Sequence, residues 1–322
     1  MSLWPQHRYD AEAAARLRAR HAAATDPATL AAELGALLGE RVEAASISTE
    51  TVAQRRWRFV IYVDARSDGG PPLSLVVKGY AHQRAGPVFA NHVALLAGGV
   101  DTSRAFGVSE ALGAIVTERL AGRHPAGDDA AAARRCGAAT ARLHRSAAAL
   151  EPRLELDGVL DHLDRHVAKF ADGAPEHGPA ALDLAAAARP LGRALGVRAD
   201  EPVQGDLSRA SFLLEEGRTH LIDWDAACAF DAAWDVGHYL AQLHRYELKS
   251  GQPTGAVREA YLAGYAEAAE PDAAFWRRVD YFEAVTCLHK AHALRQAGAP
   301  TWPRIVTGLL RVAAEAMARA GG

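Results

Sequence analysis

Apolar residues recur at helical spacing in some parts of this chain and in a strand-like pattern in others, and the changes between the two mark the predicted helices and strands. Residues 11–21 and 27–38 place Ala and Leu at helical spacing, which predicts two short helices. Residues 56–63 then alternate between polar and apolar side chains, and residues 73–80 are rich in β-branched ones. A stretch of Gly and Pro separates these two runs, so the pattern predicts an antiparallel β-hairpin.

Helical spacing returns after the hairpin and dominates the rest of the chain. Residues 87–97 predict a helix, residues 114–118 a short strand, and residues 119–122 a connector. Beyond it, apart from short strand-like pieces between residues 203 and 224, we expect helices over residues 128–149, 160–170, 179–195, 233–248, 256–269 and 274–297. This order predicts an α+β fold with a small β-rich N-terminal lobe with leading helices over residues 1–121 and a large helical C-terminal lobe over residues 122–322.

Composition narrows the classes of partner. Lys and Arg together number 36 against 39 for Asp and Glu, a net charge of −3, so no global positive field favours nucleic acid. The cysteines are three and far apart, which fits neither a disulfide framework nor a thiolate zinc site and indicates a reducing compartment. The first ten residues lack an apolar signal core, so we expect a cytoplasmic protein with no membrane partner. The oligomeric state stays open.

Two carboxylates stand out in the strand-like interruption of the helical region. Asp206 follows Gln204-Gly205 in a loop, and Asp223 follows a short apolar run in Ile222-Asp223-Trp224-Asp225. A hairpin turning at residues 216–217 would bring the two segments together. Mg²⁺ prefers carboxylate and phosphate oxygens, so such a pair beside a bound nucleotide would hold the metal and orient a hydroxyl nucleophile.

Several short stretches share the order and spacing of the motifs of one enzyme family. Residues 204–211 align with a catalytic loop H-G-D-x-x-x-x-N, and residues 222–225 with a metal-binding segment I-D-[WF]-[ED]. Residues 75–78 are similar to the strand that carries a nucleotide-binding lysine, and residues 117–122 to an interlobe hinge. Over about residues 46–265 the chain resembles the aminoglycoside phosphotransferase and choline kinase family, whose fold is the two-lobed protein-kinase-like fold.

The resemblance implies an activity and a role for each matched residue. The activity is ATP-dependent (or GTP-dependent) phosphoryl transfer to a hydroxyl of a small molecule, such as an antibiotic, an amino alcohol or a related metabolite. Asp206 would orient and deprotonate that hydroxyl, while Asp223 and Ser211 would bind Mg²⁺. Lys78 would contact the α- and β-phosphates, and the main chain of Glu118 would meet the adenine edge.

The catalytic loop departs from the family pattern at two positions. Gln204 replaces the loop His, and an amide can imitate the hydrogen bonds with which an imidazole supports such a loop. Ser211 replaces the metal-binding Asn, and its shorter hydroxyl reaches Mg²⁺ only through a backbone shift or a water molecule.

The N-terminal lobe also departs from the pattern. No Asp or Glu lies between residues 82 and 100 to pair with Lys78, and Asn91 and His92 are the nearest polar substitutes. Residues 46–57 contain no glycine, so a phosphate-covering loop there lacks the usual backbone freedom. These losses keep an alternative open, a catalytically impaired kinase-fold protein that binds a nucleotide, ligand or protein partner without phosphorylating.

Each candidate also has a purely structural interpretation. Asp206 can cap its own loop, Asp223 can support a buried Trp224, and Ser211 can satisfy backbone groups. Lys78 can be an edge-strand lysine that discourages aggregation.

Other conspicuous residues are predicted to be structural. We expect Asp235 to hold the catalytic loop, His144 to pack, and Arg209 to be a solvated loop side chain. His162 and His166 lie four residues apart on a predicted helix and could both face a metal. The glutamate of the zinc motif H-E-x-x-H is missing, however, so a solvated helix face is expected. An aromatic stripe could line an acceptor pocket for a cationic substrate, but most such stripes belong to the core, to which we assign it: Trp276, Tyr281 and Phe282.

Overall fold

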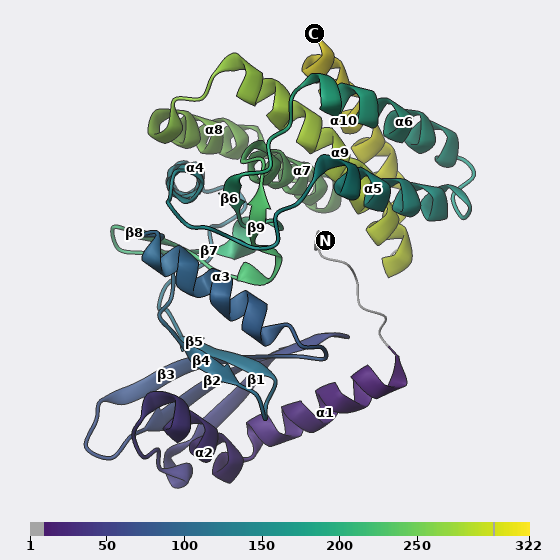
Figure 1. The fold of residues 1–322 in the computed structure, drawn as a ribbon. Helices are drawn as coiled ribbons and strands as arrows, with labels where there is room; N and C mark the ends of the chain where they lie inside the picture. Colours follow the sequence, from purple (N-terminus) through teal and green to yellow (C-terminus); the bar gives the residue numbers. More distant parts are fainter. Residues whose placement is uncertain (1–9, 299) are drawn as a thin grey trace. The chain divides into compact units, whose positions relative to one another are not determined.

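The computed structural model describes residues 10–298 and 300–322, which divide into two compact units. The sheet unit comprises residues 10–97 and 102–121, and the helical unit comprises residues 98–101 and 122–322 (Figure 1). The expectation about an N-terminal targeting segment falls mainly on residues 1–9, which lie outside the described residues. Within the described ranges, no helix is both long and apolar enough to cross a membrane.

The sheet unit contains a five-stranded antiparallel sheet in the order β1-β2-β3-β5-β4 (Figure 1). Its strands are β1 Ser48–Gln54, β2 Arg58–Arg66, β3 Pro72–Tyr80, β4 Ala105–Ser109 and β5 Ala114–Glu118. The predicted hairpin is confirmed as β2 and β3, and the predicted strand at 114–118 as β5. β1 and β4 escaped prediction because β1 is polar and exposed along most of its length and β4 is short, with Gly107 at its centre.

Helices cover both faces of this sheet. They are α1 Ala11–Thr25, α2 Pro27–Leu38 and α3 Ala85–Ala97, with a 3₁₀ turn η1 at Ala44–Ser46. Leu75 and Val77 of β3 pack in the core that α1 and α2 share with the sheet. Lys78 points to the opposite face, because successive strand residues alternate and its cross-strand partner Ile115 packs against Val88 of α3.

The helical unit is organised around α9. Its helices are α4 Ala130–His144, α5 Leu156–Ala171, α6 Gly178–Ala194, α7 Ala233–Ser250, α8 Gly255–Ala269, α9 Ala273–Ala297 and α10 Trp302–Gly321. α9 packs against α5, α6, α7 and α10. Tyr281 and Phe282 are fully buried on it, which confirms their assignment to the core, whereas Trp276 is only partly buried. α10 was not predicted, although Ile305, Leu309 and Ala316 follow helical spacing on its buried face.

Two small β-ribbons interrupt these helices. β6 Glu201–Val203 pairs with β9 Cys228–Phe230, and β7 Phe212–Glu215 pairs with β8 Arg218–Leu221. The predicted turn at residues 216–217 is confirmed, with Gly217 in the left-handed region at φ 72°. Short 3₁₀ turns follow β6 and β8, namely η2 Arg209–Ser211 and η3 Trp224–Ala226. The three cysteines are free and buried.

Helices α4 and α8 cross in close contact because glycines lie at the crossing. A Cβ on Gly264 would lie 2.0 Å from the carbonyl oxygen of Arg134, and one on Gly137 would lie 2.0 Å from that of Tyr261. The close approach also brings Nδ1 of His144, at the end of α4, to 2.9 Å from Oη of Tyr265 on α8. The crossing therefore fixes His144.

A single methyl group at this crossing should be costly. We predict that Gly264→Ala lowers the free energy of unfolding by about 1–3 kcal/mol, because the new Cβ meets backbone atoms that cannot rotate away. The control is Gly158→Ala on the exposed surface of α5, where nothing lies within 4 Å, and which should raise stability by up to about 1 kcal/mol. Urea unfolding measures both, and equal effects of the two substitutions would contradict the close crossing.

Candidate active site

The loop that carries Asp206 is held by one buried carboxylate. Asp235, in the first turn of α7, is fully buried. Its Oδ2 accepts a hydrogen bond from the N–H of Gln204 at 2.7 Å, and its Oδ1 accepts one from the N–H of Gly205 at 2.8 Å. Nε2 of His144 lies 3.1 Å from the same Oδ2. The prediction that Asp235 holds the loop before Asp206 is confirmed.

Gly205 is required where this loop passes η3. Its φ is 86°, and a Cβ there would lie 2.2 Å from the carbonyl oxygen of Ala226. Side chains larger than hydrogen are excluded by both strain and contact. The carbonyl of Gly205 in turn accepts a hydrogen bond from the indole N–H of Trp234 at 3.0 Å. The backbone just before Asp206 is therefore fixed on several sides.

The carboxylate of Asp206 meets two partners from distant helices. Its side chain is 43% exposed, and its Oδ1 lies 3.0 Å from Nε2 of His238 on α7 and 3.4 Å from Nζ of Lys290 on α9. Desolvation opposes ionisation of Asp206, but the charge of Lys290 and the hydrogen bond from His238 outweigh it, so its pKa lies well below the ordinary value. Asp206 is therefore an acceptor-only carboxylate at neutral pH.

His238 donates to Asp206 as a neutral imidazole. Burial, with the nearby charge of Lys290, lowers the pKa of His238 to about 4, even though the hydrogen bond to Asp206 opposes this shift. At neutral pH its Nε2 therefore carries the only ring hydrogen and points it at the carboxylate.

Sequence analysis missed both partners of Asp206. A signal existed for His238, which lies three residues after Asp235 and so on the same face of a predicted helix. Lys290 carried none, because only the packing of α9 brings it to the loop.

Gln204 links the two candidate carboxylate segments. Its Oε1 accepts the N–H of Asp206 at 2.9 Å, and its Nε2 donates to the main-chain carbonyl of Asp223 at 2.7 Å. An amide has one acceptor and one donor group, and both are used here. The expectation that Gln204 can support the loop in place of His is confirmed.

Asp223 stands at a strained turn after β8. Its φ and ψ of 66° and 62° are left-handed, a conformation that few residues other than glycine adopt and that concentrates at functional sites. The N–H of Ile222 donates to the carbonyl of Ser211 at 2.9 Å, so the hairpin brings the two candidate metal ligands into neighbouring segments. The side chain of Asp223 is exposed.

Ser211 is buried and already engaged with its own turn. Its Oγ accepts the N–H of Ser208 at 3.1 Å, and the side chain of Ser208 accepts the N–H of Ser211 in return. A hydroxyl oxygen has two lone pairs, so one remains for a further partner. A role of Ser211 as metal ligand stays a prediction.

Lys78 lies among polar side chains of the sheet unit. It is largely buried on the α3 side of β3, and both Asn91 and His92 are buried on α3. Burial lowers the pKa of His92, and the charge of Lys78 acts in the same direction. Nε2 of His92 lies 2.8 Å from the carbonyl oxygen of Ser103.

Glu118 ends β5, and its main chain takes part in the sheet. Its N–H donates to the carbonyl of Arg104 at 2.9 Å, and the N–H of Arg119 donates to that of Ser74 at 2.9 Å. Because both N–H groups are engaged, a contact between Glu118 and the nucleotide base would use the carbonyl oxygen of Glu118. Its role stays a prediction.

Two expectations about solvated side chains are wrong. Arg209 is partly buried, and its guanidinium carbon lies 4.1 Å from the ring centroid of Tyr246, a cation–π distance. His162 and His166 are also partly buried, because their face of α5 packs against α9 rather than facing water. Helical spacing alone gives the face of a helix but not what covers it.

The architecture defines the class of protein. A small sheet unit with a buried lysine, followed by a helical unit with a Gly-Asp loop and a second aspartate, is typical of kinase-like phosphotransferases. Residues 82–276 match the model of the phosphotransferase enzyme family. The chain belongs to this family. Among curated proteins, none matches the chain.

Solved structures show the same fold. A choline/ethanolamine kinase family protein from Mesorhizobium loti is 19% identical, with 94% of this chain and 96% of that chain covered and a TM-score of 0.65. An amicoumacin kinase bound to AMP-PNP and Ca²⁺ is 15% identical, with 85% and 89% covered and a TM-score of 0.64. A macrolide 2′-phosphotransferase from Brachybacterium faecium is 19% identical, with 88% and 97% covered and a TM-score of 0.57. The predicted α+β, protein-kinase-like fold is confirmed.

Replacing Gln204 tests the link between the two segments. We predict that Gln204→Leu lowers the free energy of unfolding by about 1–3 kcal/mol, because it removes two hydrogen bonds and leaves the N–H of Asp206 without its acceptor. Gln204→His, which restores a donor and an acceptor, should remain within about 1 kcal/mol of the wild type. Urea unfolding compares them, and a Leu variant as stable as the His variant would contradict the link.

Proposed function

We propose that the protein is an ATP- or GTP-dependent phosphotransferase that acts on a hydroxyl of a small molecule, such as an antibiotic, an amino alcohol or a related metabolite. The observation that carries the proposal is Asp206, an ionised and partly exposed carboxylate on a loop fixed by Asp235 and joined to Asp223 by Gln204. Family membership supports it, as do similar structures whose names specify choline or ethanolamine, amicoumacin and macrolides as substrates.

Asp206 performs the proton chemistry in this proposal. Its carboxylate accepts a hydrogen bond from the acceptor hydroxyl and aims that oxygen at the γ-phosphorus. As the new P–O bond forms, the bond from phosphorus to the bridging oxygen breaks, the nucleoside diphosphate leaves, and the hydroxyl proton passes to Asp206. Because Lys290 and His238 keep the pKa of Asp206 low, it is a weak base, which suits a loose transition state in which the proton moves late.

The oxygen donors near Asp206 suit Mg²⁺. Asp223 presents an exposed carboxylate and Ser211 a hydroxyl lone pair, both hard ligands. We assign these two residues to the metal, which when bound neutralises charge on the phosphate oxygens. In the N-terminal lobe, residues 1–121, we assign Lys78 to the α- and β-phosphates and the main chain of Glu118 to the base. Residues 122–322 then form the catalytic and substrate lobe.

One observation favours the alternative of an impaired, ligand-binding kinase fold. The hydroxyl of Ser211 already serves its own turn, so its share in metal binding is weaker than that of a free amide oxygen. The hydrogen bonds around Gly205 and Asp206 hold the loop in the one position that the proposed reaction uses.

Thermal unfolding with nucleotide tests the binding half of the proposal without a known acceptor. At a ligand concentration of about 100 times Kd, ATP or GTP with Mg²⁺ should add about 2.7 kcal/mol to the stability of the wild type. Asp223→Ala should lose the Mg²⁺-dependent part of this shift, while Asp183→Ala, at an exposed position on α6, should keep it. No shift with either nucleotide would reject the proposal.

Turnover tests the catalytic half. Asp206→Asn should keep the nucleotide-dependent thermal shift but lower the rate of nucleotide hydrolysis or acceptor phosphorylation by about 10²–10⁴-fold, because the carboxylate is lost from the reacting hydroxyl. Ser211→Asn, which supplies an amide oxygen to the metal, should raise the rate. Equal rates for wild type and Asp206→Asn would remove Asp206 from catalysis, and inactivity of both wild type and Ser211→Asn would favour the alternative.

A further inference from the structure

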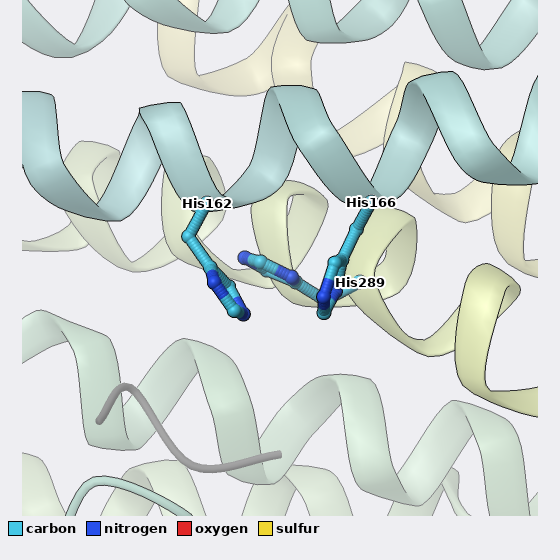
Figure 2. Close-up of side chains that lie close together, drawn as sticks. All are labelled: His162, His166 and His289. Carbon is cyan, nitrogen blue, oxygen red and sulfur yellow. The ribbon is translucent and has the colours of Figure 1, made fainter. Parts of the chain in front are cut away.

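Three histidine side chains converge between α5 and α9, away from the residues assigned to phosphoryl transfer. His162 and His166 lie one turn apart on α5 and project toward His289 of α9 (Figure 2). One ring nitrogen of each lies within 4.8 Å of those of the other two. The ring centroids of His162 and His166 are 4.1 Å apart, and that of His289 lies 5.6 Å and 5.9 Å from them.

These imidazoles have buried nitrogens with no hydrogen-bond partner among the described residues. His289 is 3% exposed, and neither of its ring nitrogens is bonded. Nε2 of His162 and Nδ1 of His166 are likewise buried and unbonded. Each buried polar group left without a partner costs about 1–3 kcal/mol. A bound cation that accepts one lone pair from each ring would remove this cost for one nitrogen of each histidine.

The charge state of the cluster suits a metal ligand set. Burial lowers the pKa of all three histidines, for His166 to about 4, and so leaves neutral imidazoles with a free lone pair. The cations Arg165 and Lys169 also act on His166, but both are exposed, so water and salt screen their repulsion of a bound ion. The buried Lys290 acts on His289, and its charge is paired with that of Asp206.

The ligand type and spacing indicate which class of metal the cluster would bind. Three imidazoles with no carboxylate suit zinc and its transition-metal neighbours rather than Mg²⁺ or Ca²⁺. Nitrogens in a tetrahedral zinc site lie about 3.3 Å apart, so rotation of the rings about their χ angles has to close the present spacing by at most about 1.5 Å. A fourth imidazole is near, since the ring of His292 lies 4.8 Å from that of His166 and its Nδ1 is also unbonded within the described part of the chain.

We propose that His162, His166 and His289 form a transition-metal site of the zinc type, with a water molecule or His292 in the fourth position. The site joins α5 to α9 one residue before Lys290, the partner of Asp206. It requires no phosphotransferase activity, so its test is independent of the proposed function.

Cobalt provides the probe, because tetrahedral Co²⁺ absorbs visible light and replaces zinc in nitrogen sites. Tag-free, chelator-treated full-length protein should bind one equivalent of Co²⁺ with a visible band, and Zn²⁺ should displace it. The double variant His162→Gln and His166→Gln should weaken Co²⁺ binding by at least about 100-fold, a loss of about 2.7 kcal/mol. Zn²⁺ should raise the unfolding temperature of the wild type but not of the double variant.

The matched control is His177→Gln, a partly exposed histidine of the same unit whose Nε2 lies 2.9 Å from Oγ1 of Thr307. This variant should bind Co²⁺ as the wild type does. His289→Ala should abolish binding, and if it fails to fold, the partly buried α5 pair decides alone. Three results would overturn the site: no visible Co²⁺ band in the wild type, equal weakening in His177→Gln, or a near-ultraviolet thiolate band that assigns the ligands to cysteine.

Discussion

The loop that carries Asp206 depends on the carboxylate of Asp235, which has no exposed surface and accepts hydrogen bonds from two consecutive backbone N–H groups. A buried charge is tolerated only when hydrogen bonds replace the water it has lost. His144 completes this set, and His144 is in place because α4 and α8 cross at glycines and Tyr265 meets its other nitrogen. Helix packing far from Asp206 thus determines the direction in which that side chain leaves the loop.

Helices α7 and α9 then set the charge of Asp206. α7 supplies both the anchor of the loop and the neutral donor His238, while α9 supplies the cation Lys290. The position of α9 is itself secured by a buried ion pair. Burial opposes ionisation of Glu283, yet hydrogen bonds from His244 and Arg258 lower its pKa to about 2, and Oε2 lies 3.0 Å from an Arg258 nitrogen. The ionisation of Asp206 therefore depends on the position in which the Glu283–Arg258 pair holds α9.

The sequence predicts those features that short contiguous stretches encode. The hairpin β2–β3 and the turn at residues 216–217 follow from local spacing. The Gln204 substitution and the role of Asp235 follow from the resemblance of short motifs to those of the family. Features that arise from packing between distant elements cannot be predicted from such local stretches. Lys290 carries no local signal, and the spacing of His162 and His166 reveals a shared face but not that α9 covers it. The polar strand β1 could not be predicted for a different reason. It is held by backbone pairing, and its exposed side chains show no hydrophobic pattern.

Two neighbouring residues of α9 reach the histidine cluster and the loop that carries Asp206. Successive residues of an α-helix project about 100° apart, so α9 directs His289 toward α5 and Lys290 toward Asp206 from the same level of the helix. Nζ of Lys290 lies 3.4 Å from Oδ1 of Asp206. Coulomb attraction over such a distance depends steeply on separation and solvent access. One helix therefore carries both a member of the histidine cluster and the cation that helps to keep Asp206 ionised.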